Sequence, residues 1–316
     1  MREVGLLVMS YGTARDPDDV EAFYTHIRRG SPPTPELLEE LKDRYRAIGG
    51  RSPFAEITEA QVRGLEAELN AEAGPGGPRF RAFSGQKHQA PYIEDAVAAM
   101  GEAGVERAVG LVLAPHYSRS SIGQYVERAE KSAAPRGIEM TFVESYATHP
   151  AFVDFVAGRV RDALAEVPDD ARDRSVVVFS AHSLPARILA AGDPYADELR
   201  ATAEAVSREA GLSPERVVTA WMSAGRTPEP WLGPDVTEVV RGLASRGVPA
   251  VVACPVGFVS DHLEVLHDID IELAEVARLA GVLLVRTRSP NDDPAFRRVL
   301  ATVVREHLTE RGWMPG

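Results

Sequence analysis

Cysteine is nearly absent from this sequence, which has a single one, Cys254, in 316 residues. One thiol cannot form an internal disulfide, and it cannot supply the set of thiolates that a zinc or iron–sulfur site needs. We therefore expect no iron–sulfur cluster bound by this chain alone. The same scarcity indicates a reducing compartment, so the expected location is the cytoplasm.

Long apolar runs are missing as well. The longest, 248–259, contains two prolines and is shorter than the ~20 residues that span a membrane. The N-terminal run 4–9 is followed by Ser10 and Tyr11, with no small-residue cleavage site. It is therefore expected to form a strand and not a signal peptide. We expect a soluble protein with no membrane span.

Positive charge is in deficit, with 35 Lys and Arg against 47 Asp and Glu and a net charge of −12. Such a surface repels phosphate backbones and anionic lipid head groups, so neither nucleic acid nor a membrane surface is expected as a partner. The P-loop, the G-x-G-x-x-G turn after a strand and the G-x-S-x-G elbow are also missing. Nucleotide-dependent and serine-hydrolase functions therefore lack their motifs.

Short apolar runs alternate along the chain with longer amphipathic segments. Strands are predicted at 4–9, 80–83, 108–113, 140–144, 175–179, 217–221, 250–254 and 282–286. Helices are predicted at 17–28, 35–47, 56–71, 93–102, 121–131, 151–165, 195–209, 234–245, 264–280 and 294–310, the first with Asp16 as its N-cap. This alternation is typical of an α/β protein whose parallel sheets are covered by helices on both faces.

The two halves of the chain share one sequence feature, a predicted strand that ends in a histidine closely followed by serine. A predicted strand runs into Ala-Pro-His-Tyr-Ser at 114–118 in the first half and into Ser-Ala-His-Ser at 180–183 in the second. We therefore predict two similarly built α/β domains, 1–130 and 131–316. A return of the last helix, 294–310, to the first domain is a further hypothesis.

Histidine and tyrosine gather where the predicted strands end, which is where open parallel sheets bind ligands. His182 follows a fully apolar strand, and a neutral imidazole there can accept a proton or bind a metal near physiological pH. The alternative is a histidine that only hydrogen-bonds the backbone of its loop.

Three acidic residues, Glu264, Asp268 and Glu272, follow another strand at the spacing i, i+4, i+8. On a helix they share one face, where their like charges repel unless a cation offsets them. Oxygen ligands suit a hard or borderline divalent ion. Apolar neighbours would desolvate these carboxylates and raise their pKa toward use as proton acceptors. The alternative is an ordinary solvated acidic face.

Paired arginines, Arg28 and Arg29, end the first predicted helix, and Arg44 and Tyr45 lie on the second. Forked guanidinium donors beside tyrosines can hold a ligand that carries carboxylates. The alternative for Arg28 and Arg29 is stabilisation of a helix C-terminus.

Eight blocks of the chain, taken together, are distinctive. They include Gly-Leu-Leu-Val-Met-Ser-Tyr-Gly-Thr at 5–13, Ser-Ala-His-Ser-Leu-Pro at 180–185 and Val-Gly-Phe-Val-Ser-Asp-His-Leu-Glu-Val-Leu at 256–266, and the others lie at 24–30, 41–50, 87–88, 113–116 and 231–235. In this order, over nearly the whole chain, they resemble the ferrochelatases, and most of all the soluble monomeric coproporphyrin III ferrochelatases of Gram-positive type.

The resemblance implies a class I chelatase fold, with two Rossmann-like domains and a porphyrin cleft between them. It implies a monomeric enzyme of heme biosynthesis that inserts Fe²⁺ into coproporphyrin III, gives Fe-coproporphyrin III (coproheme) and releases two protons. No cofactor is implied beyond the Fe²⁺ substrate. Transient contacts with the upstream or downstream enzymes of the pathway are implied as well.

The resemblance also implies roles for single residues. His182 and Glu264 would be the catalytic pair that binds the metal on one face of the porphyrin, and Tyr11 would approach from the other face. Residues implied to line the porphyrin or meet its propionates are Arg28, Arg44, Tyr45, Ser52 and Tyr125, with Lys87 and His88 in a neighbouring loop. Asp268 and Glu272 would form an outer site for a second divalent ion such as Mg²⁺. His267 either adds a ligand there or only packs.

Other functions stay open at this point. One alternative is a related chelatase that uses protoporphyrin IX or a sirohydrochlorin-type ring. Another is a module that carries a porphyrin or a metal without turning it over. A pure carrier, however, has no need of both a proton acceptor and a row of metal-binding carboxylates.

Overall fold

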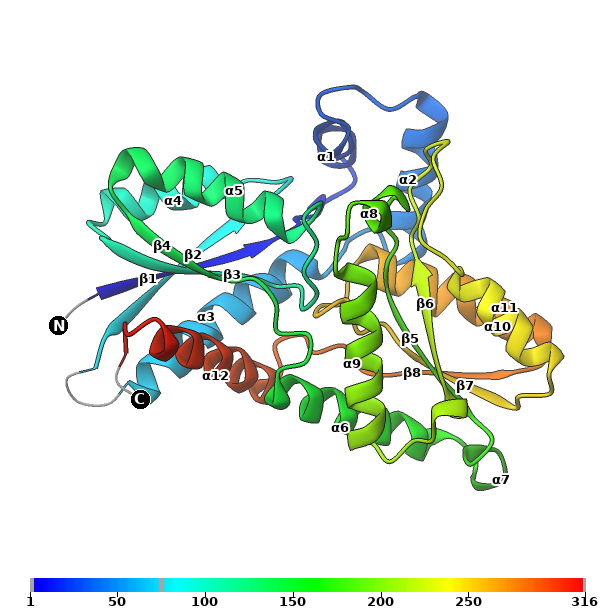
Figure 1. Ribbon diagram of the computed structural model, residues 1–316. Coiled ribbons are helices and arrows are strands. Elements are labelled where there is room, and N and C mark those ends of the chain that lie inside the picture. Colours follow the sequence, from blue (N-terminus) through cyan, green and yellow to red (C-terminus); the bar gives the residue numbers. More distant parts are fainter. Residues whose placement is uncertain (1–2, 74–76, 315–316) are drawn as a thin grey trace.

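The chain folds into two parallel four-stranded sheets, each covered by helices on both faces (Figure 1). The computed structural model describes residues 3–73 and 77–314. The first sheet has the order β2-β1-β3-β4 and the second the order β6-β5-β7-β8. Their strands are β1 Glu3–Ser10, β2 Arg79–Gln86, β3 Arg107–Val112, β4 Glu139–Val143, β5 Val176–His182, β6 Val217–Met222, β7 Ala250–Cys254 and β8 Leu283–Arg286. The predicted α/β class and its parallel sheets are confirmed.

Helices connect each strand to the next. The α-helices are α1 Val20–Ile27, α2 Pro35–Ala47, α3 Phe54–Glu72, α4 Ile93–Glu102, α5 Ile122–Ala133, α6 Pro150–Glu166, α7 Asp169–Arg172, α8 Arg187–Ala190, α9 Tyr195–Glu209, α10 Val236–Ser245, α11 Ala274–Ala280 and α12 Pro294–Glu310. Short 3₁₀ turns lie at η1 Ala134–Arg136 and η2 Pro214–Arg216, and η3 Val265–Leu273 is a π-helix. In the described part of the chain, no helix has the length and apolar character needed to cross a membrane.

Alternation along the central strands places their apolar side chains on both faces of the sheets. In β1, Leu6 and Val8 join the core formed with α3 and α12, whereas Leu7 and Met9 join the core formed with α4 and α5. The second sheet divides in the same way between α6 and α9 on one face and α10, η3 and α11 on the other. Burial on both faces is why these strands could be recognised as continuous apolar runs.

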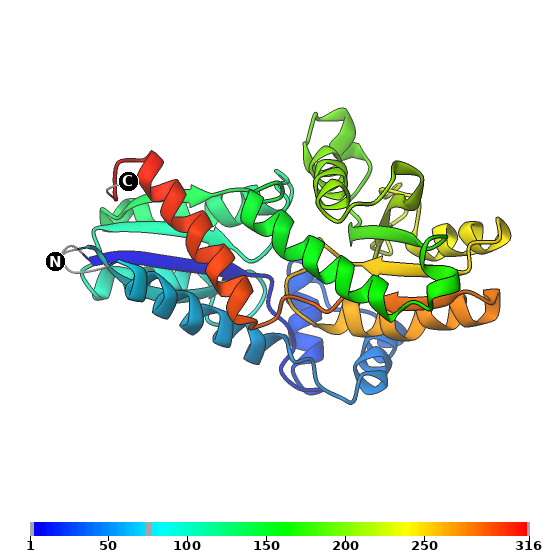
Figure 2. The same ribbon diagram turned by 90° about the horizontal axis from the view of Figure 1, so that it is seen from below.

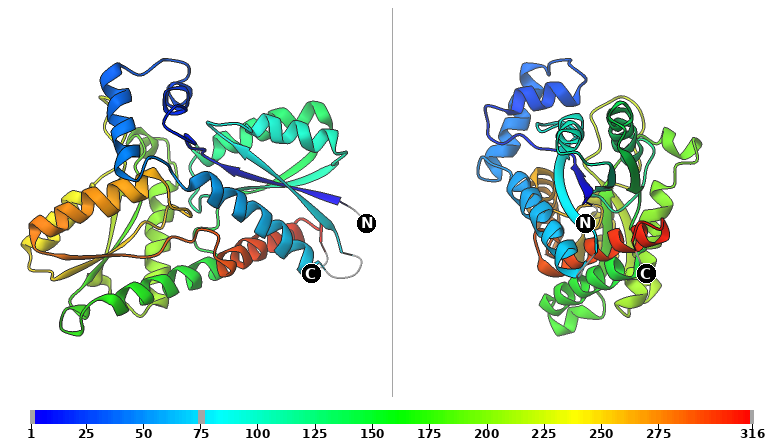
Figure 3. Two further views of the ribbon diagram at one scale, coloured as in Figure 1. Left: turned by 180° about the vertical axis from the view of Figure 1, so that it is seen from behind. Right: turned by 90° about the vertical axis from the view of Figure 1, so that its left-hand side faces the viewer.

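The last helix, α12, returns to the first sheet. It packs against α3, α6 and the strands β3 and β4, and Figures 2 and 3 show it running beside α3 beneath that sheet. One continuous apolar core extends from α3 and α12 to α6 and α9, and so joins the helical layers of both sheets.

Strand β4 belongs to the first sheet, because it pairs with β3. A domain boundary between residues 130 and 131 would therefore assign β4, a strand of the first sheet, to the second domain. Sheet membership places the division between β4 and β5. The sequence pattern alone does not reveal this, because a parallel strand pairs with neighbours that are distant in the chain.

The first helix begins later than predicted. Helix α1 starts at Val20, and Asp16 does not cap it. The Asp16 carboxylate instead accepts hydrogen bonds from the backbone N–H groups of Asp18 and Asp19, at 2.9 and 3.1 Å. Asp16 thus stabilises a turn that precedes the helix, which is the other common use of an aspartate before a proline.

Candidate active site

A cavity of about 340 Å³ lies where the carboxyl ends of the strands meet, which is within the usual size range of ligand pockets. Its walls come mainly from the residues that end or follow β1, β2, β3, β5 and β7, with Phe54, Tyr125, Tyr195 and Trp231 from other segments. The polar residues of these walls include Tyr11, Lys87, His88, His116, Tyr125, His182, Tyr195, His262 and Glu264. The two sheets therefore share one ligand cavity at the edge where such sites are expected.

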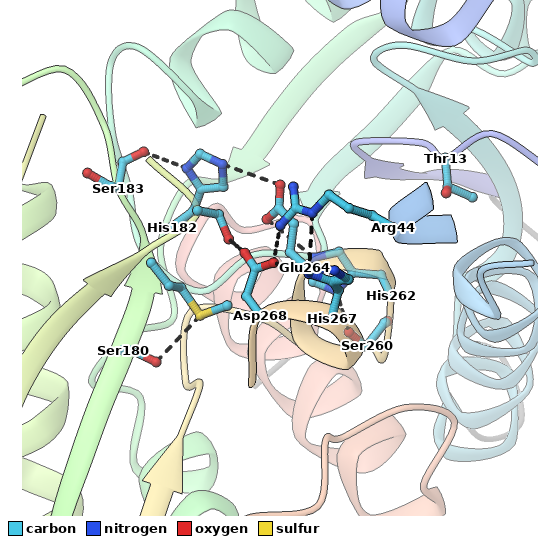
Figure 4. A network of polar contacts seen from close by, with 12 residues as sticks. Thr13, Arg44, Ser180, His182, Ser183, Ser260, His262, Glu264, His267 and Asp268 are labelled. Carbon is cyan, nitrogen blue, oxygen red and sulfur yellow. Dashed lines mark hydrogen bonds and ion pairs between the residues drawn. The ribbon is translucent and has the colours of Figure 1, made fainter. Parts of the chain in front are cut away.

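His182 and Glu264 come together in this cavity. His182 is the last residue of β5, and Glu264 directly precedes η3. The imidazole Nε2 lies 3.4 Å from the carboxylate Oε1, and the side chains are 35% and 28% exposed. Both groups are thus open to the cavity and close enough to form an ion pair (Figure 4).

A second imidazole completes this arrangement. Nε2 of His262 lies 3.5 Å from the other carboxylate oxygen of Glu264. The Nδ1 atoms of both histidines point to backbone carbonyls, that of His182 to Ser183 and that of His262 to Ser260. If each Nδ1–H donates to its carbonyl, both rings are fixed with Nε2 toward Glu264.

No role for His262 is predicted from the sequence. The sequence feature that could have indicated a role for His262 is its position two residues before Glu264, in the loop after a buried strand.

Charge pairing decides the ionisation of these groups. Burial by itself lowers the pKa of His182, but the charge of Glu264 and its contact with the ring outweigh burial and raise that pKa to about 9. Burial by itself raises the pKa of Glu264, but His182 and His262 together hold it well below its usual range. The sequence-based expectation of a raised pKa for Glu264 is therefore wrong. Desolvation is present, but two nearby imidazoles outweigh it.

The helix expected over 264–280 starts as the π-helix η3 and continues as α11. The carboxylates predicted to share one face divide between two places. Glu264 faces His182 and His262, whereas ligand atoms of His267, Asp268 and Glu272 lie within 4.8 Å of one another. π-Helices are rare and frequently occur at functional sites. An α-helical register was therefore a poor guide here.

Arg44 supplies a positive charge to the outer acidic group. Its guanidinium donates to Asp268, and its Nε lies 3.3 Å from Nδ1 of His267. The same Nδ1 is 3.2 Å from Asp268 Oδ1 and 3.8 Å from Glu272 Oε1. Asp268, which is almost fully buried, also accepts a hydrogen bond from Ser223 at 2.5 Å. Figure 4 shows Arg44 reaching from α2 to this cluster.

Among the other predicted residues, Tyr11 and Tyr125 line the cavity. Tyr11 is 43% exposed, and its ring lies against His88 with 4.6 Å between centroids. Tyr125 is buried beneath the ammonium of Lys87, which is 4.9 Å from the ring centre. Desolvation by the surrounding protein raises the pKa of both tyrosines, although Tyr11 stays partly exposed to the cavity. The charge of Glu264 adds to this for Tyr11, so both remain neutral phenols at neutral pH.

Four predicted residues lie outside the walls of this cavity as the described residues define it: Arg28, Arg44, Tyr45 and Ser52. Arg28 is exposed, and its Nε donates to the carbonyl of Ser31. Tyr45 is buried with its hydroxyl 3.1 Å from that of Thr13, and Ser52 is buried and accepts the backbone N–H of Phe54. Tyr45 and Ser52 therefore support the wall from behind.

Lys87 and His88 line the cavity on the side of the first sheet. Burial and, to a smaller degree, the charge of Arg128 lower the pKa of Lys87 to about 8. Burial, with the charge of Lys87, lowers the pKa of His88 to about 3. His88 is thus a neutral imidazole at neutral pH, in contrast to His182 across the cavity.

Comparison with known proteins decides the family. The family model named Ferrochelatase matches residues 3–308. The chain belongs to the ferrochelatase family. The resemblance found in the sequence is thereby confirmed, and with it the expectation that the protein is a ferrochelatase enzyme.

Individual ferrochelatases match over almost their full length. The chain is 47% identical over 311 residues to the coproporphyrin III ferrochelatase of Anoxybacillus flavithermus, covering 98% of both chains. It is 47% identical over 309 residues to the coproporphyrin III ferrochelatase of Bacillus subtilis, covering 97% of this chain and 98% of the relative.

Solved structures show the same fold at low sequence identity. SirB from Bacillus subtilis, solved with Fe³⁺, has a TM-score of 0.60 at 14% identity and covers 99% of both chains. CbiX, described as the terminal enzyme of siroheme biosynthesis in denitrifying bacteria, has a TM-score of 0.52 at 12% identity over 96% of this chain and 98% of its own. These likenesses support the chelatase fold and not a choice of substrate.

Proposed function

We propose that this ferrochelatase inserts Fe²⁺ into coproporphyrin III, giving Fe-coproporphyrin III and two protons. The observation that carries the proposal is the 47% identity, over 98% of both chains, to a coproporphyrin III ferrochelatase. The site supports it with an imidazole and a carboxylate that face each other beside an open cavity.

Metal insertion replaces two pyrrole protons of the ring by one divalent ion, so the site must handle a metal and two protons. We infer that Fe²⁺ binds at His182 Nε2 and Glu264 and displaces the proton that they share, because metal ligation requires the neutral imidazole. Two or three mixed nitrogen and oxygen ligands hold the ion without trapping it. His262, already beside Glu264, can take part in carrying pyrrole protons away.

The wall contributed by the first sheet would hold the other face of the ring. Tyr11 is exposed to the cavity and Tyr125 forms part of its wall. Arg28 and Arg44 are proposed to meet propionates, and for Arg44 this means exchanging Asp268 for a carboxylate of the substrate. Binding energy from such remote groups can be used to bend the ring toward the metal.

The outer site is proposed to hold a second divalent ion such as Mg²⁺ between Asp268 and Glu272, with His267 as a third ligand. Arg44 already neutralises this cluster, so an ion there would compete with its guanidinium. No resident cofactor is part of the proposal. A cytoplasmic monomer that meets neighbouring enzymes of heme biosynthesis only briefly is also proposed, from the sequence alone.

The test is an anaerobic assay of the purified protein with Fe²⁺ and coproporphyrin III, protoporphyrin IX or sirohydrochlorin, followed by the absorbance of the product. Coproporphyrin III should be the best substrate, and His182→Ala and Glu264→Gln should each abolish most turnover. Glu275→Gln, on the neighbouring helix α11, is the matched control. A preference for another ring would replace the proposed substrate, and full activity of both site variants would refute the roles given to His182 and Glu264.

A further inference from the structure

Glu264 directly precedes the π-helix η3, in the short helical turn that follows the loop after β7. π-Helices are intrinsically unfavoured and usually extend for a single turn, whereas η3 spans nine residues. Contacts from outside the helix must therefore help to hold this geometry. Because the position of the Glu264 carboxylate depends on the start of this helix, such contacts bear directly on the site.

Arg286, the last residue of β8, makes contacts of this kind. Its Nε and Nη2 donate to the two carboxylate oxygens of Asp270, at 2.7 and 3.0 Å. Its Nη1 donates to Asp261 Oδ1 at 3.1 Å. Asp261 lies three residues before Glu264 and Asp270 lies six residues after it. One guanidinium, 19% exposed, thus bonds both flanks of the residue proposed to bind the metal.

The Asp261 end of this contact is itself held firmly. Its carboxylate accepts hydrogen bonds from Ser289 Oγ at 2.6 Å and from Asn291 Nδ2 at 2.8 Å, and its backbone N–H donates to Asn291 Oδ1 at 2.7 Å. The carbonyl of Asn291 in turn accepts from Gln61 Nε2 on α3, at 2.7 Å. These hydrogen bonds connect the loop before Glu264 to the segment after β8 and to α3.

Arg286, Asp261 and Asp270 do not line the cavity that the described residues enclose. They lie behind the wall and have no place in the proposed chemistry. Their contacts lie on both sides of Glu264 along the chain.

We propose that Arg286 is a positioning residue for metal insertion, which bonds Asp261 and Asp270 together and so holds Glu264 in line with His182 and His262. The inference rests on the proposed function, because it gives Glu264 the metal. Arginine suits this role because its planar fork has enough donors for both carboxylates at fixed angles, which a lysine ammonium does not. A displacement of about 1 Å in a reacting group can cost up to about 100-fold in rate.

The experiment compares Arg286→Gln, Arg286→Lys and Asp270→Asn with the unmodified protein in the Fe²⁺ and coproporphyrin III assay. We expect kcat to fall about 10-fold or more in each variant, while the KM for coproporphyrin III and its binding, followed by porphyrin fluorescence, change less than about twofold. Arg286→Lys should not restore kcat. The double variant Arg286→Gln with Asp270→Asn should be no slower than the slower single variant, because both changes remove the same contact.

Arg278→Gln is the matched control, because Arg278 makes a similar forked pair with Glu275 on α11, at 2.7 and 2.6 Å, on an exposed surface. It should keep full kcat. The thermal unfolding midpoint is measured for every variant, and the assay is run at a temperature at which all of them are folded. If Arg286→Gln keeps kcat within twofold, or if its loss lies in the KM for coproporphyrin III, Arg286 is not a positioning residue. An unmodified protein that inserts no metal would instead refute the proposed function itself.

Discussion

The phenolic hydroxyl of Tyr195 donates a hydrogen bond to the backbone carbonyl of His182, at 3.0 Å. Tyr195 is the first residue of α9 and His182 is the last residue of β5, and the helix packs on the strand. This contact ties the strand end that carries the imidazole to the helix that covers it. The backbone that presents His182 is therefore held by a side chain from another element.

Tyr195→Phe should loosen this strand end. It leaves a partly buried carbonyl without its side-chain donor, so we expect a loss of about 1 kcal/mol in the free energy of unfolding and a several-fold loss of kcat. Tyr146→Phe is the control, because the buried hydroxyl of Tyr146 has no hydrogen-bond partner among the described residues. Urea unfolding and the Fe²⁺ insertion assay measure both effects, and equal behaviour of the two variants would contradict this account.

The stability of the protein should fall as the pH rises from about 6.5 to about 9. The pKa of His182 is raised to about 9 in the folded state, against ~6.5 in an unfolded chain. Its contribution is therefore complete below about pH 6.5 and is lost as the pH passes through about 9. Glu264→Gln removes the charge that causes the shift, so this variant should lose less stability over that range.

Urea unfolding at both pH values and an NMR titration of the His182 ring measure this effect. A His182 pKa that stays near 9 in Glu264→Gln would show that another group raises it.

Arg44→Ala should expose the outer cluster to cations. It leaves the buried Asp268 without its guanidinium partner, which we expect to cost about 2 kcal/mol, less than for a fully buried pair because Arg44 is 26% exposed. Divalent cations should offset this loss by binding His267, Asp268 and Glu272. Thermal unfolding with and without Mn²⁺ tests this, with a larger stabilisation expected in Arg44→Ala than in the unmodified protein. No such gain should occur when Glu272→Gln is added.

Gly257→Ala should move His182 and Glu264, the two residues proposed to bind the metal, apart. A Cβ at Gly257 would lie 2.5 Å from Cβ and 2.8 Å from Cα of Ala181, the residue before His182. The loop must then move away from β5, at a cost of about 1–3 kcal/mol, and metal insertion should slow with it. Gly242→Ala, in α10 with open space around it, should instead stabilise by about 0.5–1 kcal/mol. A Gly257→Ala protein of unchanged activity would show that the loop tolerates the shift.

Local pattern was enough to place the strands and most of the long helices. Strand β7 was predicted with its observed bounds, 250–254, because its five residues are buried on both faces. Helices α2, α4, α9 and α12 also begin and end where the sequence indicates. One departure is local, because the Asp16 turn delays the start of α1. Another is η3, where Asp270 bonds Arg286 from β8.

The sequence by itself determined the α/β class, the order of the elements and the family, because apolar periodicity and ordered motifs are properties of short segments. Only the tertiary structure decided which groups meet: it added His262 to Glu264, gave Arg44 to Asp268 and placed Tyr45 and Ser52 behind the wall. It also showed that the pKa of Glu264 is lowered, where the sequence predicts that it is raised. The physical reason is that hydrophobic patterning is local, whereas the energy of a charge depends on neighbours that can be distant in the chain, such as His182 for Glu264.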